Sequence, residues 1–501
     1  MSQRRLFTKS YESFVEKVAM GTIGVRRALE VLRSQGHNPL AIEKGTMSFK
    51  VWISLKVKRF RVPDLLCLKC GRRFEVRSKT KPEISMSHSL TNPDRAWYYG
   101  LNDDDYVVFI VCKKTGSEPI KWKAVGPIYY VLVKDLQNAF NNGQYFMSSK
   151  GKEEGFEKRV IWPTKFASND GKVLDIKEDY IEMLVGNRRK RIPLYMKRGG
   201  KEVKLKPLVK KGEAITKGMA IASVVDIVTQ VPCDKSVSVD HYINLLSSSS
   251  RVDRFIAAKA LRNFDDPTVR QVLRQKLYDK NEEKLVLYEV AVSLLNLNDN
   301  IGRNYIDFII NKNGDMEVDI HEILISLSEA NPNIAFPIIK NVLTNPKLPV
   351  VVRATAAWAL GELGIPEAFD ELINSFNSMD IEVKKEAARA LLQIFRKHEE
   401  AVSDKVFEKF KVPNQKHREG LSWVLGKILR DRLEEYFQDV LNLVVDEDSK
   451  IWVSYILGVQ DPKTFSDTQK ELIRSKDKEV FFAANVLWVV LKSWIWGLEE
   501  W

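Results

Sequence analysis

Small and leucine-rich apolar positions recur at helical spacing through the second half of the chain. Aligned small positions lie 34 residues apart from Ala258 to Val292 and 31 residues apart from Ala357 to Ala388. The segments with this pattern are 254–264, 288–297, 353–364, 384–395, 417–429, 452–460 and 479–491. Because a helix pair of this length cannot bury its apolar face alone, neighbouring pairs are expected to stack on a shared core. The pattern predicts an all-α solenoid over residues 245–501.

Residues 160–232 follow a different pattern, in which short apolar segments are separated by turns that contain glycine. Such spacing is typical of β-strands joined by tight turns. We therefore expect a small, basic, β-rich connector domain folded as a barrel or a sandwich.

The pattern of residues 1–150 is mixed. Apolar residues at helical spacing predict a helix that ends near Gly36, and alternation predicts a strand over residues 49–57. A hairpin is expected over residues 60–79, and the apolar runs 105–114 and 127–136 are typical of buried strands. This order predicts an α/β domain on a mixed sheet, so the fold class is multidomain.

Two stretches of the second half resemble HEAT repeats: DDPTVR at 265–270 and PVVVRATAAWALGELGIPEA at 349–368. The resemblance covers residues 245–501; it identifies the architecture and leaves the ligand open. The acidic balance and the stacked helices of this part lead us to expect a scaffold that binds a protein partner.

Charge is divided unevenly along the 501 residues, which carry a net charge of +13. Residues 1–240 have a net charge of +19, whereas residues 241–501 have −6. The basic half is therefore the expected binder of DNA, since each neutralised phosphate releases counterions. The cations expected to contact nucleic acid are Arg72, Arg73, Arg188, Arg189, Lys190 and Arg191. The alternative is that these cations only keep the sheet faces soluble.

The sequence contains no apolar run of transmembrane length, and the N-terminal residues lack the apolar region of a signal peptide. Four cysteines in 501 residues cannot form a disulfide framework. We therefore expect a cytoplasmic protein with reduced thiols and no membrane contact.

Two carboxylates, Asp64 and Glu75, flank the turn of the predicted hairpin. Antiparallel pairing can bring both to one end of the hairpin, where two hard oxygen ligands would suit Mg²⁺ or Mn²⁺. Period-two alternation puts Arg73, Glu75, Arg77 and Lys79 on one face. A metal there would activate water for attack on a phosphodiester, with Arg77 stabilising the transition state. The plainer alternative is a basic hairpin in which Glu75 pairs with a neighbouring arginine.

The helix, the strand, Pro63-Asp64, the spacer and Glu75-Val76-Arg77 together resemble the PD-(D/E)XK nucleases over about residues 10–140. The resemblance implies a metal-dependent DNA nuclease, in genome defence or repair, with Asp64 and Glu75 as metal ligands and Glu30 as an additional acid. Arg77 stands where the family has lysine, and arginine cannot act as a base. Lys79 could approach the site only if a bulge moved it. The competing hypothesis is a non-catalytic DNA-binding adaptor.

Cys67 and Cys70 are followed by Gly71 and resemble half of a zinc knuckle. A closed Zn²⁺ site needs four ligands, so Cys112 and His88 are the expected completing residues. Cys233 lies too far along the chain to be favoured. The alternative is a reduced thiol pair in a hairpin.

Overall fold

The structure is a computed structural model of the chain, and it describes residues 11–42, 60–115, 122–149, 157–311, 317–429 and 432–460. The chain divides into two compact units. Unit 1 comprises Met1–Val272 and Asn281–Val286, and unit 2 comprises Leu273–Lys280 and Leu287–Glu500. The strand expected at 49–57 and the last repeat at 479–491 lie outside the described residues.

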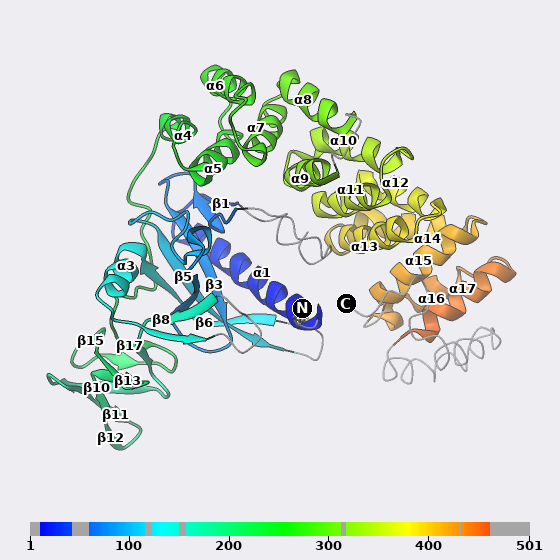
Figure 1. The fold of residues 1–501 in the computed structure, drawn as a ribbon. Helices are drawn as coiled ribbons and strands as arrows, with labels where there is room; N and C mark the ends of the chain where they lie inside the picture. The colour runs from blue at the N-terminus through cyan, green and yellow to red at the C-terminus, as the bar shows by residue number, and fades with distance from the viewer. Residues whose placement is uncertain are drawn as a thin grey trace, which may run out of the picture. The chain divides into compact units, whose positions relative to one another are not determined.

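A five-stranded mixed sheet forms the centre of unit 1 (Figure 1). Its order is β1-β2-β3-β5-β6, where only the β3–β5 pair is parallel. The strands are β1 (Pro39–Ala41), β2 (Leu65–Cys67), β3 (Arg73–Lys79), β5 (Tyr106–Lys114) and β6 (Trp122–Leu132). The expected mixed sheet is therefore present, with the helix α1 (Tyr11–Ser34) packed on it.

Both faces of this sheet are covered. On one face, α1 packs against Phe74, Val76 and Val108. On the other face, Val107 and Phe109 join a core with Trp97 and Trp162. That second core also includes residues of α3 (Val133–Asn141) and of a three-stranded sheet, β4-β8-β7. The strands of this sheet are β4 (Ser85–Ser89), β7 (Phe146–Ser149) and β8 (Glu157–Ile161), and a short 3-10 helix, η1 (Pro93–Arg95), follows β4.

The expected strand 127–136 is corrected at its C-terminal end. β6 ends at Leu132, and α3 begins at Val133. The buried residues of α3 are Val133, Leu136 and Ala139, which are spaced by three as on one face of a helix. The continuous apolar run concealed this change of period.

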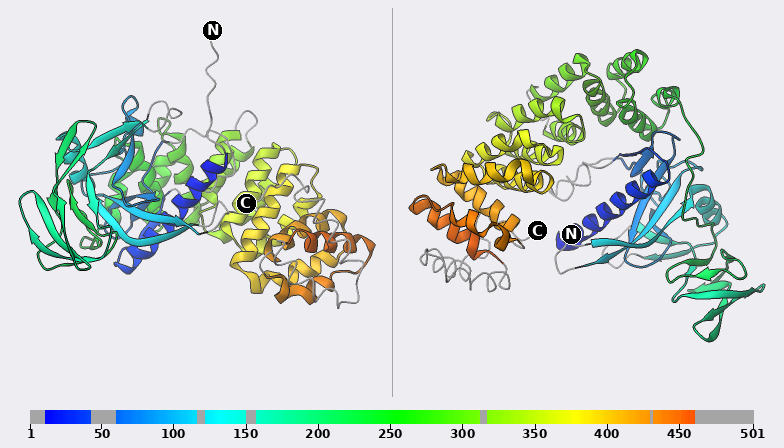
Figure 2. Two further views of the ribbon diagram at one scale, coloured as in Figure 1. Left: turned by 90° about the horizontal axis from the view of Figure 1, so that it is seen from below. Right: turned by 180° about the vertical axis from the view of Figure 1, so that it is seen from behind.

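The β-rich part of unit 1 consists of two small sheets and a hairpin around one core. The sheet orders are β12-β11-β10-β16 and β15-β17-β9, and β13 pairs with β14. The strands are β9 (Thr164–Phe166), β10 (Gly171–Ile176), β11 (Tyr180–Val185), β12 (Arg188–Pro193), β13 (Tyr195–Arg198), β14 (Lys201–Lys204), β15 (Lys206–Pro207), β16 (Ala214–Ile215) and β17 (Ala220–Ser223). These described strands form no closed barrel, so the barrel alternative is wrong. Figure 2 shows this part of the chain, coloured teal and green, from two further sides.

The remaining described residues form the predicted helical repeats. The helices are α4 (Val239–Leu245), α5 (Arg251–Leu261), α6 (Pro267–Leu277), α7 (Lys284–Asn296), α8 (Asn300–Asn311), α9 (Glu317–Leu327), α10 (Pro332–Thr344), α11 (Val350–Leu363), α12 (Phe369–Asn374), α13 (Ile381–Lys397), α14 (Glu399–Lys411), α15 (Gln415–Ile428), α16 (Leu433–Leu441) and α17 (Glu447–Gly458). Two 3-10 turns, η2 (Pro366–Ala368) and η3 (Ser375–Asn377), flank α12. None of the helices described here combines the length and the hydropathy that crossing a bilayer requires.

Alternate helices of unit 2 pack side by side, with α11 on α13, α13 on α15 and α15 on α17 (Figure 1). Small residues make this close approach feasible. A Cβ atom added to Gly361 on α11 would lie 2.8 Å from the Cα atom of Ala390 on α13. Ala357 and Ala388, which the repeat pattern singled out, are fully buried. Each repeat thus relies on its neighbour for half of its core.

Ala357→Asp should lower the free energy of unfolding of unit 2 by about 4 kcal/mol, because it buries an unpaired charge between packed helices. Thermal unfolding followed by circular dichroism at 222 nm measures this. The matched control is Ala401→Asp, at an exposed position in the first turn of α14, which should leave the melting transition unchanged. Equal melting of both variants would contradict the packing described here.

Candidate functional site

Asp64 and Glu75 lie at one end of the β2–β3 hairpin. Leu65 pairs with Phe74 in the antiparallel register, so one further step places Asp64 opposite Glu75. Leu65 and Phe74 belong to the core beneath α1, and side chains alternate along a strand. Both carboxylates therefore project from the face opposite α1, where directly opposed residues have Cβ atoms about 5 Å apart.

Each carboxylate is held by a defined donor. Asp64 Oδ2 accepts a hydrogen bond of 2.6 Å from the backbone N–H of Val76. Glu75 is 3% exposed, and its Oε1 atom accepts a hydrogen bond of 2.5 Å from Arg61 and forms an ion pair with Arg77. Two guanidinium groups thus neutralise one buried carboxylate. The sequence reasoning missed Arg61, although it lies only three residues before Asp64.

Lys79 could approach this site only through a bulge, and this condition is not met. The register of β3 with β5 is unbroken from Phe74 to Lys79, so β3 has no bulge that could move the side chain. The position lies about 13 Å along the strand from Glu75. Lys79 Nζ donates a hydrogen bond of 2.9 Å to Ser85 Oγ on β4.

The prediction of Glu30 as a third metal ligand is also corrected, because Glu30 does not lie near the two carboxylates. It projects from α1, which covers the opposite face of the sheet from Glu75. Its carboxylate is about half exposed and pairs with Arg27 at 3.3 Å. No group of three or more metal-ligating side chains in the described part of the chain includes Glu30.

The prediction that Arg72 and Arg73 contact nucleic acid is corrected. Their side chains are 8% and 2% exposed and form bonds inside unit 1. Arg72 donates to the carbonyl of Pro232 at 2.8 Å and pairs with Asp234 at 2.7 Å. Arg73 pairs with Asp253 at 2.6 Å. Period-two reasoning placed Arg73 and Glu75 on a solvated face, whereas the first four residues of β3 are all buried.

The other basic cluster is on the surface. Arg188, Arg189, Lys190 and Arg191 are all exposed on β12, the edge strand of its sheet. Arg191 stacks over the ring of Tyr180 at 4.9 Å. Because successive side chains of a strand point to opposite faces of the sheet, the four cations of β12 project from both faces at this edge. This basic edge, residues 188–191, has the exposure that phosphate binding requires.

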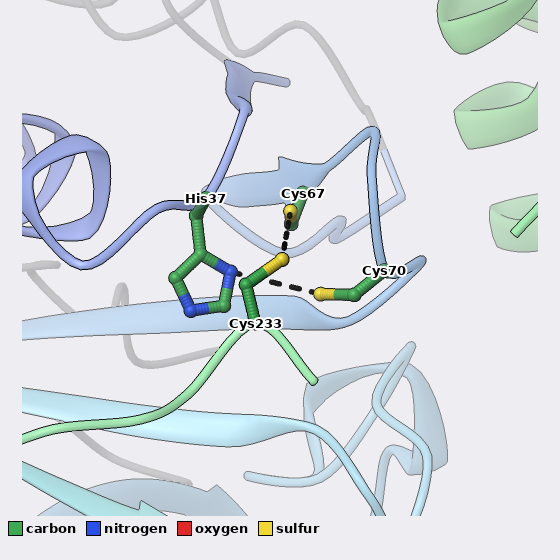
Figure 3. A group of neighbouring side chains, drawn as sticks. All are labelled: His37, Cys67, Cys70 and Cys233. Atoms are coloured by element: carbon green, nitrogen blue, oxygen red, sulfur yellow. Dashed lines mark hydrogen bonds between the residues drawn. The ribbon is translucent and has the colours of Figure 1, made fainter. Parts of the chain in front are cut away.

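A second constellation lies at the turn of the hairpin (Figure 3). One ligand atom from each of His37, Cys67, Cys70 and Cys233 lies within 4.8 Å of the others. Cys67 Sγ is 3.9 Å from Cys233 Sγ, and Cys70 Sγ is 3.6 Å from His37 Nδ1. The hydrogen bond from Cys70 lowers the pKa of Cys67, and the same contact together with burial raises the pKa of Cys70.

The expected completion of this site by Cys112 and His88 is corrected. Cys112 lies in the core beneath α1, where its Sγ atom is 4.0 Å from the carbonyl oxygen of Met20. His88 packs edge-on against Phe140 at 5.3 Å. His37 and Cys233 take these places, and no local spacing in the sequence indicated them.

Comparison with known proteins supports the repeat architecture. The family model of the PBS lyase HEAT-like repeat matches residues 352–378, which include α12 and most of α11. HEAT-like repeats of this kind are typical of surfaces that bind proteins. No protein of curated function matches the chain.

Two solved structures show a partial likeness to the chain. The X-ray structure of YibA of Escherichia coli is 18% identical, covers 51% of this chain and 93% of its own, and has a TM-score of 0.26. Human deoxyhypusine hydroxylase in complex with glycerol is 17% identical, covers 44% of this chain and 83% of its own, and has a TM-score of 0.19.

Replacing the four cations of the basic edge with glutamate should weaken binding to duplex DNA. The slope of log K against log salt should fall by about 2 to 4, since each lost phosphate contact removes about 0.9. Fluorescence anisotropy over a salt series measures both quantities. The matched control reverses four exposed cations of unit 2, Lys347, Arg396, Lys397 and Lys405, and should leave the slope unchanged. An unaltered slope in the basic-edge variant would support the alternative that these cations only keep the sheet faces soluble.

Proposed function

We propose that this protein is a metal-dependent DNA nuclease whose helical repeats bind a protein partner. The nuclease site would consist of Asp64 and Glu75 on the β2–β3 hairpin, as the resemblance to the PD-(D/E)XK nucleases implies. A role in genome defence or repair is part of the same proposal and rests on that resemblance alone.

The observation that carries the proposal is the juxtaposition of two carboxylates on one face, with two guanidinium groups on Glu75. Carboxylate oxygens are the ligands that Mg²⁺ and Mn²⁺ prefer. The described residues add no third protein ligand to this pair. The donor set therefore fits an ion that completes its octahedron with water and with phosphate oxygens.

The bound ion would supply an activated water and offset charge on the phosphate. The residues of the chain hold this arrangement in place. The Val76 N–H orients Asp64, and Arg61 fixes the carboxylate of Glu75. Arg77 keeps its charge at every accessible pH, so it can offer two parallel N–H donors to a phosphate. When DNA arrives, Arg77 would exchange its bond to Glu75 for one to the scissile phosphate.

The second candidate function is a non-catalytic DNA-binding adaptor. The ion pairs from Arg61 and Arg77 favour it, because they satisfy Glu75 without any metal. The arginine in place of the family's lysine favours it too. The two candidates differ in whether cleavage depends on the two carboxylates.

The proposed protein partner is assigned to the repeats because residues 241–501 have a net charge of −6 and would repel phosphate on average. A pocket on unit 2 offers a surface of suitable chemistry. It is lined by Lys384, Gln415, Lys416, Glu419, Ile451, Trp452 and Tyr455. Aromatic and aliphatic side chains surrounded by charges are the composition of protein contact sites.

Asp64→Asn and Glu75→Gln should each reduce cleavage of plasmid and linear DNA in Mg²⁺ or Mn²⁺ by roughly 100-fold or more. Both amides keep an oxygen that can accept the bonds from Val76 N–H or Arg61, so the fold should be preserved. The matched control is Glu178→Gln, which removes an exposed carboxylate of unit 1 and should retain cleavage. DNA affinity should stay within about twofold of wild type in all three variants. Wild-type cleavage by both site variants, or no cleavage by the wild type, would support the adaptor instead.

Arg77→Lys should retain cleavage within about tenfold of wild type, or increase it, because the PD-(D/E)XK nucleases have lysine at this position. Its ammonium group can still offset phosphate charge, although it cannot bond in two parallel directions. The measurement is the initial cleavage rate at saturating metal. Complete loss would indicate that the planar guanidinium has its own bidentate role.

A further inference from the structure

We propose that His37, Cys67, Cys70 and Cys233 bind one structural Zn²⁺ ion in unit 1. The four side chains come from three separate stretches of the chain and point toward one another (Figure 3). The site is independent of the nuclease proposal, because it uses none of the residues assigned to cleavage.

The distances match those of a tetrahedral zinc site. Zn–S bonds of about 2.3 Å and Zn–N bonds of about 2.0 Å place two sulfur ligands about 3.8 Å apart, and sulfur and nitrogen about 3.5 Å apart. The observed separations are 3.9 Å from Cys67 to Cys233 and 3.6 Å from Cys70 to His37. These two separations match the coordination sphere of one ion, and all four ligand atoms lie within 4.8 Å of one another.

The surroundings also orient the ligands. His37 Nε2 lies 3.0 Å from the carbonyl oxygen of Val231, so it donates there and leaves Nδ1 as the acceptor that faces the thiols. Zinc-ligating histidines have such an outer hydrogen bond, which fixes the tautomer. The backbone N–H of Asn38 donates to Cys67 Sγ at 3.4 Å, which stabilises a thiolate.

The turn between the two nearby cysteines has the required backbone. Gly71 follows Cys70 with φ of 72°, a left-handed conformation that glycine adopts without strain. This turn closes with the Gly71 N–H donating to the carbonyl oxygen of Cys67 at 2.8 Å. It directs both thiols to the same side of the hairpin, as a knuckle requires.

Three thiolates and one imidazole select a soft or borderline ion and disfavour Mg²⁺. His37, Cys67 and Cys70 are buried, at 6%, 0% and 4% exposure. Four protein ligands close the tetrahedron and leave no position for water or substrate. The chemistry therefore points to a structural zinc ion rather than a catalytic one.

The ion would fasten the end of the β-rich part to the hairpin. Cys233 follows β17 and precedes α4, whereas Cys67 and Cys70 belong to the hairpin turn. Two further interactions join the same two segments. Arg72 forms an ion pair with Asp234, and the Val237 N–H donates to the Lys69 carbonyl oxygen at 2.9 Å. Zinc would thus fix the hairpin whose opposite end carries Asp64.

Elemental analysis of the purified full chain, expressed with zinc in the medium, tests the site. Wild type should contain about one zinc per chain, and the zinc content of Cys233→Ser should be lower by about fivefold or more. Cys112→Ser is the matched control, since Cys112 is a buried cysteine outside the cluster, and it should retain one zinc. Equal loss in the two variants would overturn the assignment.

A second measurement on wild type does not depend on how the variants fold. Replacing zinc with Co²⁺ should give thiolate-to-metal absorption bands and the ligand-field spectrum of a tetrahedral site. X-ray absorption at the zinc edge should show three sulfur neighbours and one nitrogen neighbour. Wild-type protein without metal, or with a Cys67–Cys233 disulfide in mass spectra after purification without reductant, would contradict the proposal.

Discussion

The burial of β3 on both of its faces is the constraint on which the rest of unit 1 depends. A strand in this position can carry charged residues only if each is paired, because an unpaired buried charge costs several kcal/mol. Arg73 has Asp253, and Glu75 has Arg61 and Arg77. These pairs draw α5 and the segment before β2 onto the strand. The same requirement holds the Glu75 carboxylate in place, since moving it would break two ion pairs.

The two proposed metal sites lie at opposite ends of the β2–β3 hairpin. Hard carboxylate oxygens lie at the open end and soft sulfur ligands lie at the turn, so each end would select a different metal. This division allows a structural ion to rigidify the hairpin without competing for the carboxylates. The helical repeats add a third property, since residues 241–501 have a net charge of −6 and would repel phosphate on average.

Local periodicity predicted those parts whose neighbours in space are also neighbours in sequence. The repeats of unit 2, the helix before Gly36 and the opposition of Asp64 to Glu75 all follow from helical spacing or from a hairpin register. The ligands His37 and Cys233 depend on contacts across 30 and more residues, for which a single sequence holds no signal. Arg73 was assigned to the surface because alternation alone cannot tell a solvated face from a second buried one.

Anomalous diffraction from a crystal grown with Mn²⁺ and a short DNA duplex tests the central claim most directly, since data at the manganese and zinc edges locate both ions. The account predicts a manganese peak within about 2.5 Å of carboxylate oxygens of both Asp64 and Glu75. It also predicts a zinc peak among His37, Cys67, Cys70 and Cys233. A duplex bound to unit 1 with Glu75 still paired to Arg61 and Arg77, and with no manganese beside it, would contradict the account.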